Sequence, residues 1–290
     1  MKLTHSRAVV LMVAVTLMWS TAGVVSRHLE SARSFEVTFW RSLFTLLSLA
    51  VILPLWQGRG IWRKFRSASP ALWVSGVCWS LMFTSFMLAL TLTSVASVLL
   101  IMSLGPMFTA LLARVFIGHR LAWYTWLSIV VAGIGMAWMF GAQAQDGGLA
   151  GTLVALCVPL SGAVNWTVVQ HAHAKGRDVD LVPSVLIGAA LSSLYTLPLA
   201  LPLQATAHDI GLLALLGLVQ LAIPCTLSVL CARVLKAPEM ALLALLEVVF
   251  GILLAWIGAG EAPAAAVLAG GSLVVAALVT NELLGWKLRR

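Results

Sequence analysis

Apolar and polar positions divide the chain into ten long apolar stretches, which are separated by short polar segments. A helix needs about 17–25 apolar residues to cross the hydrocarbon core of a bilayer. A backbone exposed to lipid must satisfy its own hydrogen bonds, and a helix does so. The pattern therefore predicts an all-α integral membrane protein with spans at 8–26, 35–56, 71–91, 94–116, 122–141, 151–171, 182–203, 210–230, 239–258 and 263–284.

The overall composition also indicates a chain that lies in lipid. Hydrophobic residues make up 61% of the 290 positions and charged residues only 10%, and the mean hydropathy is +1.02. Soluble domains carry roughly 45–50% apolar and about 25% charged residues. The chain has too little polar surface to coat a water-soluble globule.

The positions of Lys and Arg predict the orientation of the spans. Cytoplasmic loops carry an excess of Lys and Arg, so both termini are predicted to be cytoplasmic. Arg27 and Arg33 lie on the opposite side, and Arg41 lies within the second span. The net charge of +8 forms no basic stripe or docking motif, so we expect no nucleic-acid partner. The other 15 basic residues share one side: Lys2, Arg7, Arg59, Arg63, Lys64, Arg66, Arg114, Arg120, Lys175, Arg177, Arg233, Lys236, Lys287, Arg289 and Arg290.

Two pairs of segments about half the chain apart resemble one another. Residues 12–26 align with 153–167 at an offset of 141, and 104–120 align with 246–262 at an offset of 142. The interpretation is two five-span repeats, 1–145 and 151–290. Because five is odd, the second repeat is inverted in the membrane, a plan that places a substrate site at the interface of the repeats. Chance similarity between apolar stretches is the alternative. The matches include Val13/Val154, Ala14/Ala155, Ser20/Ser161, Ala22/Ala163, Phe108/Phe250, Leu111/Leu253 and Gly118/Gly260.

The order and spacing of several motifs resemble a known family. The motifs are Trp19-Ser20 at the end of the first span, Arg41 in the second, Gly105-Pro106 in the fourth, GHRLAW (118–123) and PEMALLALLEVVFGILLAWIGAGE (238–261). They resemble the EamA-type drug/metabolite transporters over essentially the whole chain, and among these most resemble the YddG-type aromatic amino-acid exporters.

The resemblance implies a bacterial-type inner-membrane transporter with ten helices around a central cavity, lined by spans 1, 3, 4, 6, 8 and 9. Members move small metabolites, often amino acids and often outward. The chain departs from many relatives at Glu247-Val248, where they have Glu-Pro. Because of this departure, the sequence does not determine whether the ninth span bends.

Two of the charged residues in the predicted spans are candidates for a site. An ionised Glu247 in an isolated helix would cost on the order of 2.5–3.5 kcal/mol, so its side chain should face the bundle interior. It either contacts substrate or a coupling proton, or it is a structural acid bonded to its neighbours. Arg41 either anchors the second span or binds a substrate carboxylate through a bidentate contact.

Aromatic and polar residues on the predicted cavity spans complete the candidate site. Trp79, Phe83 and Phe86 recur at spacings of four and three, which places them on one helix face. Asn165 must find partners in lipid, and Pro106 and Pro224 interrupt spans 4 and 8, where they could act as gating bends. The predicted substrate-binding set is Trp19, Ser20, Arg41, Trp79, Phe83, Phe86, Ser103, Asn165, Trp166, Gln220, Ser228 and Glu247.

No other chemistry is indicated by the sequence. His171 and His173 are two residues apart, so on a helix they point to different faces, and no third metal ligand is near. The four cysteines form no CxxC motif and are interpreted as apolar packing residues. We find no nucleotide-binding motif or catalytic triad, and so we expect neither a cofactor nor an enzyme.

These observations favour a secondary transporter of neutral and aromatic amino acids and related small metabolites, acting as an exporter or facilitator. An exporter of drugs or hydrophobic cations from the same superfamily is the alternative. A membrane-embedded enzyme would need several acids or histidines clustered within the bilayer, and only Glu247 lies deep. The expected partners are the substrate and the lipid bilayer, and whether the chain forms a homodimer stays open.

Overall fold

The computed structural model describes residues 3–26, 28–32, 34–58, 60–61, 69–92, 95–118, 121–140, 149–174, 180–259 and 264–288. Within these ranges the regular structure is helical, and no strand occurs. The helices are α1 (His5–Ser26), α2 (Ser34–Gln57), α4 (Pro70–Leu92), α5 (Val95–Met102), α6 (Gly105–Ile117), α7 (Trp123–Phe140), α8 (Leu149–Ala174), α9 (Pro183–Ala200), α10 (Ala207–Leu215), η2 (Leu216–Ala222), α11 (Ile223–Cys231), α12 (Ala237–Ala244), α13 (Leu246–Ala259) and α14 (Ala265–Leu288).

Seven helical segments in the described part are long and apolar enough to cross a membrane. Three shorter apolar segments, His5–Trp19, Gly105–Ile117 and Trp123–Trp138, fall below that length. The all-helical membrane class is therefore confirmed, and the number of ten crossings stays a prediction. The seven are Phe35–Gln57, Pro70–Ala89, Leu149–Ala172, Pro183–Ala200, Ala207–Cys231, Ala237–Leu254 and Ala265–Gly285.

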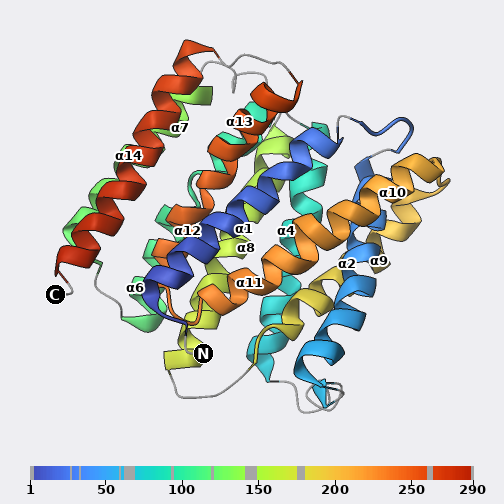
Figure 1. The fold of residues 1–290 in the computed structure, drawn as a ribbon, viewed down its shortest axis with the longest axis horizontal. Coiled ribbons are helices and arrows are strands. Elements are labelled where there is room, and N and C mark those ends of the chain that lie inside the picture. The colour runs from blue at the N-terminus through green and yellow to red at the C-terminus, as the bar shows by residue number, and fades with distance from the viewer. Residues whose placement is uncertain are drawn as a thin grey trace.

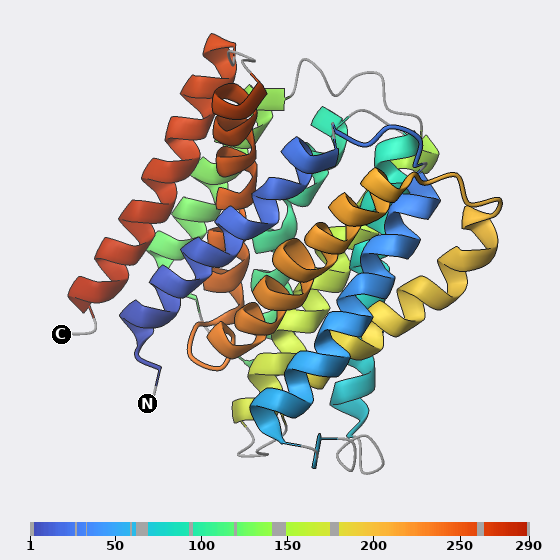
Figure 2. The same cartoon turned by 45° about the vertical axis from the view of Figure 1, so that its right-hand side comes forward.

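The helices form one bundle with both chain ends at the same end of it (Figure 1). Helices α7 and α14 pack together along one edge, while α2, α9 and α10 lie on the opposite side (Figure 2). Helix α1 packs on η2, α11 and α13, and α8 packs on α4 and α6. Segments from the first and second halves of the chain therefore alternate through the centre.

Glycines allow close approach between helices that are distant in sequence. A Cβ added at Gly76 of α4 would lie 2.6 Å from Ile187 Cγ2 of α9, and one at Gly188 of α9 would lie 2.4 Å from Trp79 Cβ. A Cβ at Gly217 of η2 would lie 2.6 Å from Phe44 Cβ of α2. Small residues at such contacts let backbones pack directly, which favours association between helices in lipid.

A buried polar cluster joins α4, α8 and α9. Ser75 Oγ donates a hydrogen bond to Asn165 Oδ1 at 2.6 Å, and it lies 2.8 Å from Ser184 Oγ. All three side chains are fully buried. The Asn165 amide therefore finds the partners that lipid cannot supply, although its Nδ2 has no partner within the described residues.

Two spans are interrupted near their middles. Between α5 and α6, Leu104 N–H bonds Ile101 O at 3.1 Å, and between α12 and α13, Leu245 N–H bonds Leu242 O at 3.1 Å. Bonds over three residues in place of four mark a tightened turn. The first break precedes Pro106, but the second forms beside Val248. The ninth predicted span is therefore interrupted although it has no proline at the break.

The eighth predicted span changes its helical pitch in the middle. Helix α10 continues into the π-helical turn η2, and α11 follows with Pro224 in its first turn. Proline has no N–H to donate and its ring displaces the preceding turn, so a locally widened helix is the expected response. Turns of this kind often occur at functional sites in helices.

At the end of the bundle opposite the termini, two buried carboxylates hold loops from both halves of the chain. Asp209 of α10 accepts hydrogen bonds from the backbone N–H groups of Glu30, Ser31 and Ala32 at 2.8–3.1 Å. Glu36 of α2 accepts from the N–H groups of residues 204 and 205 at 2.8–3.0 Å. Bonds to an ionised acceptor are about twice as strong as neutral ones, so these loops are firmly joined.

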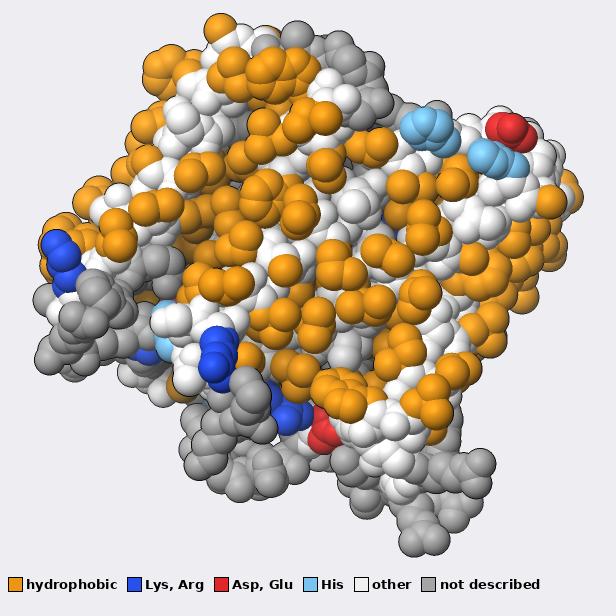
Figure 3. Space-filling model, viewed as in Figure 1, with side chains coloured by type: hydrophobic (Ala, Val, Ile, Leu, Met, Phe, Trp, Pro, Cys, Tyr) orange, Lys and Arg blue, Asp and Glu red, His pale blue; other side chains and the backbone are white. Residues whose placement is uncertain are grey.

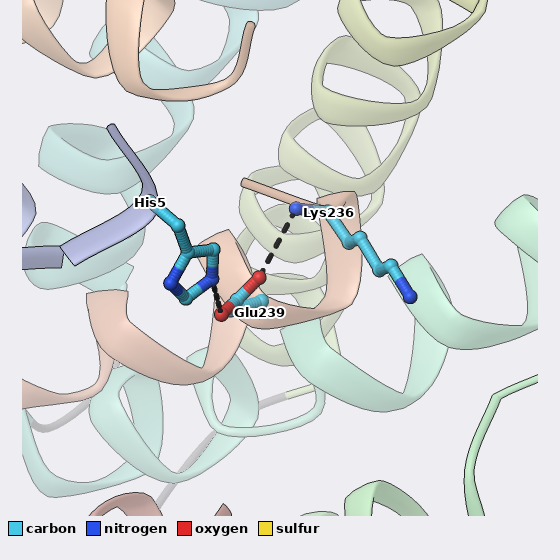
Figure 4. Close-up of polar contacts among 3 residues, drawn as sticks. All are labelled: His5, Lys236 and Glu239. Carbon is cyan, nitrogen blue, oxygen red and sulfur yellow. Dashed lines mark hydrogen bonds and ion pairs between the residues drawn. The ribbon is translucent and has the colours of Figure 1, made fainter. Parts of the chain in front are cut away.

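The end that carries the termini is joined by a side-chain pair. His5 Nε2 of α1 lies 2.6 Å from Glu239 Oε1 in the first turn of α12 (Figure 4). The other carboxylate oxygen of Glu239 accepts from the Lys236 N–H at 3.3 Å, which caps α12. One carboxylate thus fixes the start of α12 and ties it to the start of α1.

Exposed side chains follow the pattern expected for a bundle in lipid. Hydrophobic side chains cover most of the face in Figure 3, and Lys and Arg side chains gather toward the end with the termini. Among the described basic residues, only Arg41 is buried. The five exposed ones, all at or near helix ends on the terminal side, are Arg7, Arg114, Arg233, Lys236 and Lys287.

Candidate functional site

A central cavity of about 160 Å³ lies between seven helical segments of both halves of the chain. Its walls come from α1, α2, α4, the α5–α6 pair, α8, the η2–α11 pair and the α12–α13 pair. The helix breaks described above border it, since Met102 and Gly105 flank one and Leu245 borders the other. Interrupting a helix at the cavity leaves backbone groups there that a regular helix would have paired.

Aromatic rings form one wall of the cavity. The Trp79 and Phe83 rings of α4 have centroids 5.6 Å apart, and Trp79 meets Trp166 of α8 edge-on at 5.7 Å. Edge-to-face pairs at such distances are favourable beyond their buried area. Phe86 and Met82 continue this wall, which is suited to an apolar ligand group.

Arg41 contributes the cationic group of the cavity wall. Its side chain is buried, and Nη2 donates to the Phe83 backbone oxygen at 3.3 Å. Its Nε is buried without a hydrogen-bond partner in the described part of the chain. A guanidinium can donate through five N–H bonds, so Arg41 keeps donor capacity for a further acceptor.

Glu247 contributes the acidic group, from the first turn of α13. Glu247 and Arg41 form no ion pair within 4.0 Å among the described contacts. A carboxyl group and a guanidinium thus line one cavity without direct contact.

Other polar atoms at the cavity also lack partners among the described residues. Gln220 Nε2 donates to the Trp19 backbone oxygen at 3.4 Å, but its Oε1 is buried and unpartnered. The indole Nε1 of Trp79 is likewise buried without an acceptor. Buried polar groups are nearly always hydrogen-bonded, so unpaired donors and acceptors around one cavity indicate a site that a polar ligand completes.

The structure brings together eight of the twelve predicted substrate-binding residues. Each of the eight lines the cavity, and they come from six helical segments. They are Trp19, Arg41, Trp79, Phe83, Phe86, Trp166, Gln220 and Glu247.

The other four predicted residues do not line the cavity. Asn165 belongs to the buried cluster with Ser75. Ser20 and Ser228 donate to backbone oxygens three residues earlier in their own helices, at 2.7 and 2.8 Å. Ser103 is buried at the break between α5 and α6.

The two predicted bend residues lie in the first turns of α6 and α11. Pro106 and Pro224 are both buried, and each follows an irregular turn. Neither lines the cavity, but Gly105 beside Pro106 and Cys225 beside Pro224 do. The prolines therefore shape the backbone at the cavity without contacting its contents.

Several lining residues were not singled out from the sequence. Met82 and Met102 contribute flexible apolar surface, while Gly162, Ala241 and Ala244 leave room for the cavity. Small residues in a membrane helix usually indicate close packing between helices, so their sequence signal is ambiguous. Met82 could have been found, because it lies one turn before Phe86 on the same helix face.

The residues that the structure describes contain no group of three His, Cys, Asp or Glu side chains that could hold a metal ion. Chemically, the cavity can bind a small molecule that offers both an acceptor to Arg41 and a donor to Glu247. The aromatic wall can pack against the rest of the molecule.

Comparison with known proteins bears on the helical fold. Residues 6–141 match the model of the EamA-like transporter family. A solved crystal structure has the same fold with a TM-score of 0.76, at 20% sequence identity, over 98% of this chain and 100% of its own. No curated protein sequence matches the chain. The match covers the first half of the chain and, with the apolar helices, supports a multi-pass membrane protein that is similar to this transporter family.

Proposed function

We propose that this chain is a secondary transporter of neutral and aromatic amino acids and related small metabolites, working as an exporter or facilitator. The observation that carries the proposal is the set of unpaired polar groups in the central cavity. Within the described part of the chain, Arg41 Nε and Trp79 Nε1 are donors without acceptors, and Gln220 Oε1 is an acceptor without a donor. They lie around one cavity with the Glu247 carboxylate and an aromatic wall.

A zwitterionic amino acid complements this set. Its carboxylate would accept from the Arg41 guanidinium, which favours planar two-oxygen acceptors. Its ammonium group would donate to Glu247 and to Gln220 Oε1. Its side chain would pack on Phe83, on Trp166 and on the rest of the aromatic wall, where apolar and aromatic groups are favoured.

The proposed architecture has ten spans in two inverted repeats, 1–145 and 151–290. Gly76 and Gly217 are 141 positions apart, and each allows close approach to the second helix of the opposite half, α9 or α2. The tightened turns at Leu104 and Leu245 are also 141 positions apart. The packing of α1 on α13 also has its counterpart in the packing of α8 on α6. These offsets agree with those of the sequence repeat.

Alternating access would then come from rocking of the two halves about the central cavity. Contacts between the halves occur at both ends of the bundle. The His5–Glu239 pair joins them at the end with the termini, and Asp209 joins them at the opposite end. Opening either end requires loss of the contact there, so the two contacts would form in alternation during the cycle.

For the orientation we propose that both termini are cytoplasmic in a bacterial-type inner membrane. All five exposed basic residues in the described part lie at or near helix ends on the side of the termini. An excess of Lys and Arg marks the cytoplasmic side of a membrane protein. The oligomeric state, including a homodimer, stays a prediction to be measured.

Proteoliposome transport tests the proposal. Purified protein should move labelled tryptophan and methionine across the bilayer faster than protein-free vesicles do. In parallel, amino-acid transport by wild type and by Glu247→Gln is measured with and without a proton gradient. Loss of gradient-dependent accumulation alone would identify Glu247 as a coupling group. Equal equilibration by both proteins would identify a facilitator. Absence of amino-acid transport under all conditions would refute the proposal.

An exporter of hydrophobic cations is the second candidate, favoured by a carboxylate beside aromatic rings. Trp19, Trp79 and Trp166 could contact a cation through their ring faces while Glu247 supplies charge. Arg41 argues against this, because it would repel a cation in the same cavity. Competition of tetraphenylphosphonium against labelled tryptophan distinguishes the two. Transport of the cation without transport of tryptophan would favour the second candidate.

A further inference from the structure

A second cavity, of about 370 Å³, lies away from the central one. Its walls are the start of α4, the last turns of α6 and the C-terminal part of α8. All three of these helix ends lie at the end of the bundle that carries the termini (Figures 1 and 2). No residue lines both cavities in the described part of the chain.

The polarity of this cavity changes along its length. Ser69 and His171 lie at the helix ends, and Thr167 lies one turn deeper in α8. Val74, Leu112 and Val164 line the part nearer the middle of the bundle, and they are entirely apolar. A ligand that fits this gradient has a polar head toward the helix ends and an apolar tail directed into the bundle.

The polar end holds two buried hydroxyl groups without partners. Thr167 is only 5% exposed, and its Oγ1 has no hydrogen-bond partner among the described residues. Ser69 Oγ is also buried, and no described residue is its partner. Hydroxyls buried without partners are costly, and few occur in native structures. Their presence in one cavity indicates a ligand with hydrogen-bond acceptors.

The electrostatics of the polar end favour an anionic head. Helix α4 begins at Pro70, so the positive end of its dipole lies at this part of the cavity. Leu72 N–H bonds the Ser69 oxygen at 3.0 Å, which fixes Ser69 as the residue before the helix. Arg114, in the last turn of α6, adds an exposed cation at the same end.

The apolar part of the cavity is open toward the lipid-facing surface. Val74 is 42% exposed and Phe116 is 67% exposed, although both line the cavity. Exposed apolar side chains at this depth of a membrane bundle face acyl chains. An acyl chain can thus enter from the side, while its headgroup stays at the level of the helix ends.

We infer that this cavity binds one anionic phospholipid from the leaflet on the side of the termini. The phosphate would accept from the Ser69 and Thr167 hydroxyls near the positive end of the α4 dipole, and one acyl chain would fill the space beside Val74. The assignment of that leaflet as cytoplasmic rests on the orientation proposed above, but the lipid site itself does not depend on the transported substrate.

The test uses native mass spectrometry of the detergent-purified full chain, titrated with dioleoyl phosphatidylglycerol or dioleoyl phosphatidylcholine. Val74→Trp places a large ring in the apolar part of the cavity. Val77→Trp, on the same helix, is the matched control, because Val77 is 45% exposed and lines neither cavity. Thr167→Val removes one unpaired hydroxyl with little change in shape.

We expect wild type and Val77→Trp to bind phosphatidylglycerol at least tenfold more tightly than phosphatidylcholine. Val74→Trp should lose this binding, and Thr167→Val should weaken it about fivefold to tenfold. Inorganic phosphate should not compete at millimolar concentration, since the acyl chain is part of the ligand. Effective competition by phosphate would overturn the lipid assignment in favour of a free anion.

Equal retention of both lipids by the wild type would overturn the inference. So would unchanged phosphatidylglycerol binding in Val74→Trp. If Val74→Trp blocked tryptophan binding but kept the lipid, the cavity would be an entrance for substrate instead. Failure of tryptophan transport in wild type, with the lipid pattern intact, would refute the proposed function and leave the lipid site standing.

Discussion

Replacing Arg41 by lysine separates a role in substrate binding from a role in anchoring α2. Lysine keeps the positive charge and most of the apolar stem, but it loses the planar fork that binds two carboxylate oxygens. Among the described residues Arg41 makes one long bond, 3.3 Å, to the Phe83 oxygen, and its Nε makes none. Most of its bonding capacity is therefore available to a ligand.

The expected magnitude follows from the lost bond. One charge-assisted hydrogen bond contributes about 1.5–3 kcal/mol, and each 1.4 kcal/mol changes a dissociation constant about tenfold. Arg41→Lys should therefore weaken tryptophan binding by roughly 10- to 100-fold. Binding of tryptamine, which lacks the carboxylate, should change by less than about threefold, because its ammonium group would still pair with Glu247.

The assay is equilibrium binding of labelled tryptophan and tryptamine to detergent-purified protein, with melting temperature measured on the same samples. Arg7→Lys is the control, since Arg7 is exposed at the start of α1 and lines neither cavity. Equal losses for both ligands, together with a lower melting temperature, would show that Arg41 is structural. Unchanged binding of both would refute carboxylate recognition by this residue.

Two further substitutions test the packing and the contacts between the halves. Gly188→Ala places a Cβ 2.4 Å from Trp79 Cβ, so we expect a loss of about 1–3 kcal/mol of stability, seen as a lower melting temperature. Gly211→Ala is the control, because a Cβ there has no atom within 4 Å, and its melting temperature should be equal to that of wild type or higher. His5→Ala removes the 2.6 Å contact to Glu239, so hydrogen–deuterium exchange in the first turn of α12 should rise about fivefold; unchanged exchange there would show that the pair does not hold the two halves together.

The sequence alone was enough to predict the class of the fold. The apolar stretches lie on the helices of the structure because lipid offers no partner for an unpaired backbone, so hydropathy and helix formation coincide. The repeat itself stays a prediction, which is favoured by two spacings of 141 positions, Gly76 with Gly217 and Leu104 with Leu245. The positions of these breaks were less predictable, since the one at Leu245 has no proline beside it.

Residue type located much of the candidate site. Charges and aromatic rings within apolar spans stand out, because a charge is costly in lipid and must face the bundle interior. Arg41, Glu247 and Trp79 were found in this way, and all three line the cavity. The same reasoning did not separate them from Asn165, whose amide is instead held by Ser75 in a buried cluster. A polar side chain avoids lipid equally well in the cavity wall and in a buried cluster.

What the sequence determined by itself is therefore the all-helical membrane class and the few residues that cannot face lipid. Only the tertiary structure decided which of those residues share one cavity, which are paired with neighbours, and that a second cavity contains the unpaired hydroxyls of Ser69 and Thr167. The physical reason is that hydropathy and helical periodicity are local properties of the chain. The rotation and neighbours of each helix are set by contacts such as Gly76 on α9 and Gly217 on α2, which join segments far apart in sequence.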